Sequence, residues 1–141
     1  MYLLDVNVLV GAMRVDSPRH ATMRRCVEAL RNAPEPFGLC EPVLSGALRV
    51  LTHPRAFAPP TPLPLALAFI RALRGSPNAL VLQPGPRHWQ LFTSLVSDTQ
   101  AVGNRIPAAW LAALAIEHSC VMLSDDTDFA RFPGLSWQRP E

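Results

Sequence analysis

The chain has 141 residues, of which 49% are hydrophobic and only 17% are charged. This length fits one domain, residues 1–141, with a single core, and apolar residues spread along the whole chain exclude an intrinsically disordered protein. The net charge of +2 is too small to indicate nucleic-acid binding by itself, although all 13 basic residues are arginine. Because the planar guanidinium group binds phosphate well, the composition permits a nucleic-acid substrate without requiring one.

The cysteines and the N-terminal residues indicate the cellular compartment of the protein. Three cysteines without a CxxC spacing are typical of a reducing compartment, and no basic region precedes the first apolar run, so no signal peptide is expected. No apolar run reaches the roughly 18–20 residues of a membrane span. We therefore expect a cytoplasmic protein that does not enter a membrane. The low charge also predicts a homodimer that covers apolar surface of the helices at 18–32 or 64–74.

Helix-start signals and proline clusters divide the chain into elements. Asp16, Ser17 and Pro18 form a helix-start signal, and five prolines between positions 54 and 64 indicate a loop. Residues 2–10 begin with a short buried strand that ends on Asp5 and is followed by a further apolar run. In chain order we predict a strand at 2–4, a helix at 18–32, a strand at 37–40, a helix at 41–52, a loop at 54–64, a helix at 65–73, a strand at 80–82, helices at 86–96 and 107–118, a strand at 120–123, a short turn at 128–131 and a final segment at 135–137.

Short apolar strands that alternate with helices of about ten residues or more are typical of one fold class. They predict an α/β protein whose sheet is mainly parallel. In such sheets, ligands bind beyond the carboxyl ends of the strands. The residues that directly follow each strand are therefore the first candidates for a functional site.

Acidic residues gather at these positions. Asp5 follows the first strand, Glu41 the second, and Asp125, Asp126 and Asp128 the fourth, so five of the 11 acids stand at strand ends. Carboxylates brought together repel one another, and because the chain has no lysine, arginine or a divalent metal must compensate. Hard oxygen ligands suit Mg²⁺ or Mn²⁺, which can polarise a phosphodiester and activate water. The pattern therefore favours metal-assisted phosphate chemistry.

Each of these acids also has a structural interpretation. Asp5 directly follows a buried strand, where an acid without a function would be costly, so we favour a function for it. Glu41 could be a first-turn acid that complements the helix dipole, and one of Asp125 and Asp126 could only cap the turn before Phe129. Receiver domains and haloacid-dehalogenase-type phosphatases also place an aspartate after the first strand. Both need a catalytic lysine, which this chain lacks.

Four segments carry a family resemblance. They are Leu4-Asp5-Val6-Asn7-Val8-Leu9, the run from Glu41 to Pro54, the helix segment 103–115, and Ser124-Asp125-Asp126-Thr127-Asp128-Phe129 with its continuation to Leu135. Each motif is weak alone, but the four occur in order between Leu3 and Trp137. Together they resemble the PIN-domain ribonucleases, and most closely the VapC-type toxins of bacterial toxin–antitoxin pairs.

The resemblance implies a three-layer α/β/α PIN domain with a short, mainly parallel sheet of four or five strands. It implies an endoribonuclease that uses Mg²⁺ or Mn²⁺, cuts RNA such as tRNA or rRNA and inhibits translation. It also implies a VapB-like antitoxin and a toxin dimer. The site residues that follow are the catalytic acids Asp5, Glu41 and Asp126; Asp5, Asp126 and the position of Ala108 for the metal; Asn7, Ser45, Ser124 and Asp128 as supporting polar residues; and Arg14, Arg49, Arg55 and Arg131 for RNA phosphates.

One position departs from the family pattern. The family reads Asp-Ala-x-Leu-Ala-Ala where this chain reads Ala108-Ala109-Trp110-Leu111-Ala112-Ala113, so a metal carboxylate is replaced by a methyl group. A deliberate aspartate-to-alanine change, made so that a toxic nuclease can be produced, fits this pattern, and so does a natural variant. We therefore expect a weak or inactive nuclease. The alternative is a non-catalytic PIN module that binds RNA or a protein partner.

Overall fold

Five short strands of the computed structural model, which describes residues 1–141, form one fully parallel sheet. Their order is β3-β2-β1-β4-β5, which places β1 at the centre. The strands are β1 (Tyr2–Leu4), β2 (Phe37–Leu39), β3 (Ala79–Val81), β4 (Val121–Leu123) and β5 (Ser136–Gln138). Because every strand runs in the same direction, all five carboxyl ends lie at one edge.

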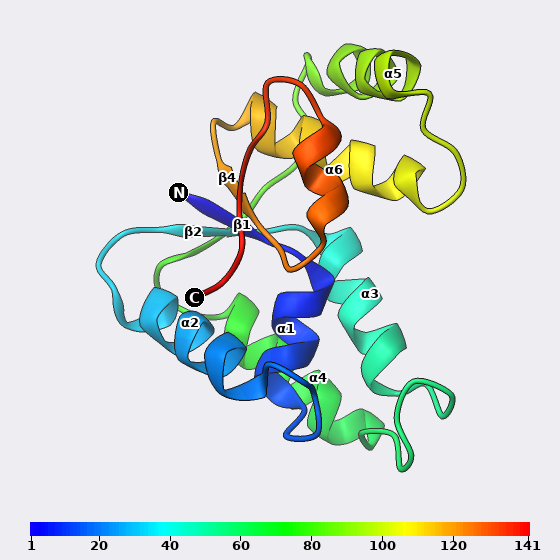
Figure 1. Ribbon diagram of the computed structural model, residues 1–141. Helices are drawn as coiled ribbons and strands as arrows, with labels where there is room; N and C mark the ends of the chain where they lie inside the picture. The colour runs from blue at the N-terminus through cyan, green and yellow to red at the C-terminus, as the bar shows by residue number, and fades with distance from the viewer.

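Six α-helices cover the two faces of this sheet. Figure 1 shows α5 and α6 on one side of the strands and α1 to α4 on the other. The helices are α1 (Val6–Met13), α2 (His20–Asn32), α3 (Glu41–Leu51), α4 (Leu63–Arg74), α5 (His88–Thr99) and α6 (Arg105–Glu117), and a 3₁₀ turn, η1 (Thr127–Arg131), precedes β5. The prediction of an α/β fold with a short parallel sheet is confirmed. The final segment at 135–137 contributes the fifth strand.

The connection order places a topological switch point between β1 and β4. From β1 the chain moves through β2 to the edge strand β3, and it then crosses back to β4 on the other side of β1. In open parallel sheets, ligands bind at such a point, beyond the carboxyl ends of the strands. The residues that follow β1 and β4 therefore occupy the position in which this fold builds a site.

Helix α1 is a correction to the sequence analysis, which assigned no helix to the apolar run after Asp5. Asp5 is the N-cap of this helix, and its side chain accepts a hydrogen bond from the backbone N–H of Val6. The following residues from Val8 to Ala12 are buried, so packing on both sides overrides the strand propensity of the valines. A Cβ atom at Gly11 would lie only 2.7 Å from Met23 Cγ, so this glycine allows α2 to pack closely against α1.

The start of α2 is a second correction. The helix begins at His20 with Arg19 in the N-cap position, and Asp16 provides no cap. Asp16 instead forms an ion pair with Arg14, with 2.6 Å between Nη2 and Oδ2. The residues predicted to start the helix, Asp16 to Pro18, form a turn instead, in which the backbone N–H of His20 donates to the carbonyl of Ser17.

None of the helices has both the length and the hydrophobicity needed to cross a membrane.

Glu117, the last residue of α6, ties that helix to the segment before α5. Its carboxylate accepts hydrogen bonds from the backbone N–H groups of Gly85 (2.7 Å) and Arg87 (2.9 Å), and its side chain is 8% exposed. Burial raises the pKa of Glu117, but these hydrogen bonds and the neighbouring His118 outweigh burial and hold the pKa below its ordinary value. The ionised carboxylate therefore stabilises the fold.

The substitution Glu117→Gln is expected to lower the free energy of unfolding by about 1.5–3 kcal/mol at neutral pH, because the amide replaces a charged acceptor. A carboxylate with a lowered pKa stabilises above its unfolded-state pKa, near the ordinary value of 4.5, and this contribution is lost as the pH falls through the lower folded pKa. Urea unfolding at several pH values measures the difference. Glu28→Gln, at an exposed helical ion pair, should cost less than about 0.5 kcal/mol. A Glu117→Gln deficit that persists in acid would contradict this account.

Candidate active site

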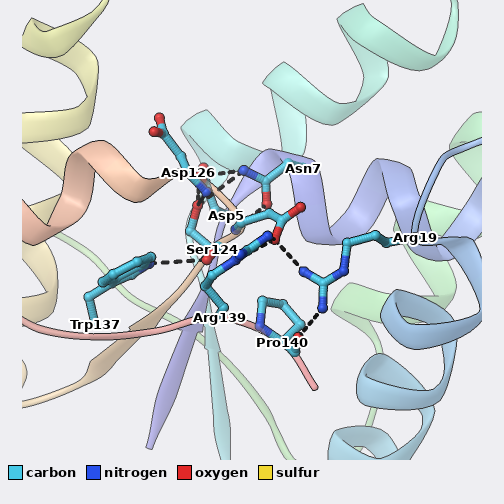
Figure 2. A network of polar contacts seen from close by, with 9 residues as sticks. Asp5, Asn7, Arg19, Ser124, Asp126, Trp137, Arg139 and Pro140 are labelled. Atoms are coloured by element: carbon cyan, nitrogen blue, oxygen red, sulfur yellow. Dashed lines mark hydrogen bonds and ion pairs between the residues drawn. The ribbon is translucent and has the colours of Figure 1, made fainter.

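Asp5 lies at the switch point, directly after the central strand β1. Its side chain is largely buried and makes three hydrogen bonds within the protein, and Figure 2 shows two of the donor residues, Asn7 and Ser124. Oδ1 accepts from the backbone N–H of Val6 at 2.8 Å, and Oδ2 accepts from the Ser124 hydroxyl at 2.6 Å and from Asn7 Nδ2 at 3.2 Å. No arginine or histidine pairs with it. The central carboxylate is thus held in place by neutral donors alone.

The electrostatic environment of Asp5 is unfavourable for a charge. Burial raises the pKa of Asp5, the hydrogen bonds from Ser124 and Val6 lower it, and the nearby Asp126 carboxylate raises it further; the net shift is upward. Two acids therefore lie close together, and neither forms an ion pair with an arginine or a histidine. This arrangement favours the binding of a positive group.

Ser124 connects the residues after β1 with those after β4. Its buried hydroxyl donates to Asp5 and accepts from Asn7 Nδ2 and from the backbone N–H of Asp126, both at 3.0 Å. Asn7 Oδ1 also accepts from the backbone N–H of Asp125 at 3.1 Å. Asp126 is exposed and caps η1, because its Oδ1 accepts from the backbone N–H of Asp128 at 2.9 Å. The sequence prediction placed Asp5, Asn7, Ser124 and Asp126 in one site, and the structure brings these four together.

Glu41 does not join this group. It is the first residue of α3, it is exposed, and its Oε2 lies 3.6 Å from Arg74 Nη2. With Ser45 it lines a separate cavity of about 440 Å³ that also contains Gln83 and Trp110. No three His, Cys, Asp or Glu side chains gather closely enough to hold a metal ion. Glu41 therefore contacts an arginine of α4 and takes no part in the hydrogen-bond network around Asp5. The convergence of Asp5, Glu41 and Asp126 on one cleft stays a prediction.

Ala108 lies half-buried near the start of α6. Arg105, one turn earlier on the same face of the helix, approaches Asp128, with 3.9 Å between Nε and Oδ2. This face of α6 therefore borders the loop that carries Asp126. Asp128 is also 3.4 Å from Arg131, so its carboxylate lies between two arginines.

The four arginines predicted to hold RNA differ in their exposure to solvent and in whether a carboxylate pairs with them. Arg14 is the least exposed of the four, because its side chain is only 15% exposed, pairs with Asp16 and lies 4.3 Å from the centre of the Phe57 ring. These contacts tie Arg14 to the proline-rich loop, and its role in RNA binding stays a prediction. Arg131 pairs with Asp128, whereas Arg49 and Arg55 are exposed and have no carboxylate partner.

The sequence analysis missed a cluster of charged residues beside Asp5. Arg19 and Arg139 both donate to Asp125, and Arg19 also donates to the carbonyl of Pro140 (Figure 2). Burial raises the pKa of Asp125, but the two arginines outweigh burial and hold the pKa below its ordinary value. Asp125 was interpreted as a possible turn cap, a role that Asp126 fills instead. Because Arg19 and Asp125 are 106 positions apart, no local pattern could reveal this cluster.

The donors present fit a hydrated divalent cation. Asp5 and Asp126 supply hard carboxylate oxygens, and one oxygen of Asp126 has no protein partner. Small divalent cations are often held by one or two carboxylates, with water and substrate phosphate as the other ligands. This pair of acids lacks the further carboxylate that the family pattern places at position 108.

Comparison with known proteins agrees with this geometry. The sequence model of the PIN domain matches residues 2–135. Ribonuclease VapC43 of Mycobacterium tuberculosis is 46% identical over 140 residues, which cover 99% of this chain and 95% of that protein. Ribonuclease VapC25 of the same species is 42% identical over 99% of both chains. Among solved structures, VapBC2 from Rickettsia felis bound to a promoter DNA fragment has a TM-score of 0.72 at 14% identity and covers 99% of this chain and 98% of that one.

Proposed function

The chain belongs to the PIN-domain family, among relatives named VapC ribonucleases, and from this membership we propose that it is the toxin of a toxin–antitoxin pair. Its activity is that of a metal-dependent endoribonuclease that cuts RNA and inhibits translation, and residues 1–141 form one PIN domain. The observation that carries this proposal is the Asp5 carboxylate, buried at the switch point beside Asp126 and held by neutral donors.

The residues of the site have distinct roles in this proposal. Asp5 and Asp126 hold a divalent cation, Mg²⁺ or Mn²⁺, which when bound supplies charge for polarising the phosphodiester and activating water. Ser124 and Asn7 hold the Asp5 carboxylate in one orientation through the hydrogen bonds described above. Glu41 and Ser45 lie at the same sheet edge, next to β1, and take the outer position of the acidic set. Asp128, two residues after Asp126, holds Arg105 and Arg131 through ion pairs.

The partners follow from the relatives. The VapBC structures that share this fold contain an antitoxin with the toxin, and we assign a VapB-like antitoxin to this chain. We assign the protein to the cytoplasm, where its RNA substrate, tRNA or rRNA, occurs. The exposed side chains of Arg49 and Arg55 are positioned to contact phosphates of the RNA backbone. Leu63 and Leu65 of α4 are 55% and 57% exposed, and we assign this apolar surface to a homodimer.

Mn²⁺ is expected to raise the melting temperature of the purified chain. At ten times its dissociation constant, a ligand specific for the folded state adds about 1.4 kcal/mol of stability, which corresponds to roughly 5 °C for a domain of this size. Differential scanning fluorimetry with and without a chelator measures the shift. Asp126→Asn should remove most of this increase in melting temperature. Asp98→Asn, at an exposed acid of α5 that is not part of the candidate site, should leave the increase unchanged. An equal shift in all three proteins would show that Mn²⁺ binds elsewhere.

Cleavage of RNA tests the proposed activity. Total RNA is incubated with this chain and with its Ala108→Asp variant, in Mg²⁺ or Mn²⁺ and in a chelator control. Metal-dependent cleavage in the variant supports the endoribonuclease. If neither protein cleaves several candidate RNAs but both bind them, the chain is instead a non-catalytic PIN module, a function that Ala108 itself favours.

A further inference from the structure

Two arginine side chains converge on one carboxylate beside the candidate site. Arg19 Nη1 donates to Asp125 Oδ1, and Arg139 donates to the same oxygen from Nε at 2.9 Å and from Nη2 at 2.7 Å (Figure 2). Two positive groups therefore share a single negative one, so the cluster has a net charge of +1. Arg19 lies just before α2 and Arg139 just after β5, so the fold assembles the cluster from opposite ends of the chain.

The cluster adjoins the same cavity as the candidate catalytic acid. Asp5, Asn7, Arg19 and Asp125 all line a cavity of about 390 Å³. The Arg19 side chain is 32% exposed and that of Arg139 is 50% exposed, so solvent reaches both. A guanidinium group has five N–H donors. Arg19 uses donors on Nη1 and Nη2, and Arg139 uses donors on Nε and Nη2, so each guanidinium group has further N–H groups without a hydrogen-bond partner in the protein.

We propose that Arg19 and Arg139 form a phosphate-binding site that holds the RNA backbone beside Asp5. This inference rests on the proposed function, because it states which side chains receive the substrate of that activity. The acids of the site repel RNA, and because the chain has no lysine, arginine is the side chain that can offset this repulsion alongside a bound cation. The forked guanidinium group matches two oxygens of a phosphate at once. Asp125, which lines the cavity, accepts hydrogen bonds from both guanidinium groups and so restrains them. This restraint reduces the side-chain entropy lost when RNA binds.

Fluorescence anisotropy with a labelled single-stranded RNA, in a chelator so that cleavage cannot proceed, tests this site. Arg19→Ala and Arg139→Ala are each expected to lower the affinity about tenfold. Each should also reduce the slope of log affinity against log salt by about 0.7, the value for one phosphate contact on a single strand. Arg19→Lys should keep the slope but lose part of the affinity, because it keeps the charge without the fork. Circular dichroism establishes that each variant is folded.

Arg25→Ala is the matched control, because Arg25 is an exposed arginine of α2 without a carboxylate partner. It should change affinity and slope far less than Arg19→Ala. If the parent chain binds RNA while Arg19→Ala and Arg139→Ala bind it equally well, the phosphate site is overturned and the proposed function stands. Equal losses in Arg25→Ala and Arg19→Ala indicate a general charge effect and also overturn the site. If the parent chain binds none of the RNAs tested, both the site and the proposed function fail.

Discussion

The Ala108→Asp variant is expected to cleave RNA in Mg²⁺ or Mn²⁺ at least about 10–100-fold faster than the parent chain. Removal of a residue that only supports a metal ligand already costs about this factor, and a direct ligand should matter more. Position 108 lies on the face of α6 that borders the loop of Asp126, because Arg105 on the same face approaches Asp128. A carboxylate here would add a third acid to Asp5 and Asp126, which is what the site lacks.

The variant should remain folded, although it loses some stability without metal. Alanine favours helix and carries no charge, whereas a third carboxylate adds repulsion that metal relieves. A Gln100→Asp variant, at an exposed residue with a positive φ of 51° just after α5, adds the same charge outside the residues of the site and should not restore cleavage. Equal, robust cleavage by the parent chain and by Ala108→Asp would show that position 108 is not catalytic in this protein.

In the Ala108→Asp background, Asp5→Asn is expected to reduce RNA cleavage by more than about 100-fold while the fold is retained. The amide keeps an oxygen that can accept from Val6 or Ser124, but it removes the negative charge that would hold the cation. Because burial and the neighbouring Asp126 raise the pKa of Asp5, the ionised side chain is unfavourable in the folded protein at neutral pH. Asp5→Asn should therefore be at least as stable as its parent in the absence of metal.

Two measurements separate these effects. Urea unfolding in a chelator reports stability, and cleavage of a defined RNA reports activity, so a stable but inactive Asp5→Asn protein is the expected result. Asp98→Asn again serves as the control for loss of one acid. A large loss of stability in Asp5→Asn would mean that the carboxylate is needed for folding, and the assignment of Asp5 to catalysis would then lose its main support.

The fold was largely predictable because its signals are local. The apolar strands, the helix from Glu41 and the proline-rich loop each depend on residues within about ten positions of one another. Helix α1 was missed because Val6, Val8 and Val10 favour a strand, and only the Asp5 cap and burial on both sides make a helix there. The start of α2 was misplaced because Asp16 pairs with Arg14, and the helix begins four residues later at His20.

The candidate site was predictable only where position along a strand determines it. Asp5 and Asp126 follow neighbouring strands, so the rule about carboxyl ends places them together. The side chain of Glu41 is long and exposed, and it contacts Arg74, a residue of another helix that no local pattern links to it. The cluster of Arg19, Asp125 and Arg139 depends on contacts between opposite ends of the chain, which no short pattern records.

The hydrogen bond from Ser124 to Asp5 joins residues that are 119 positions apart. During synthesis, a growing chain that has not yet reached β4 therefore carries Asp5 without the hydroxyl that orients it and without its acidic neighbour Asp126. Domains generally fold as units, and contacts at such long sequence separation form late. The candidate site is thus not assembled until nearly the whole chain has been translated and has left the exit tunnel of the ribosome.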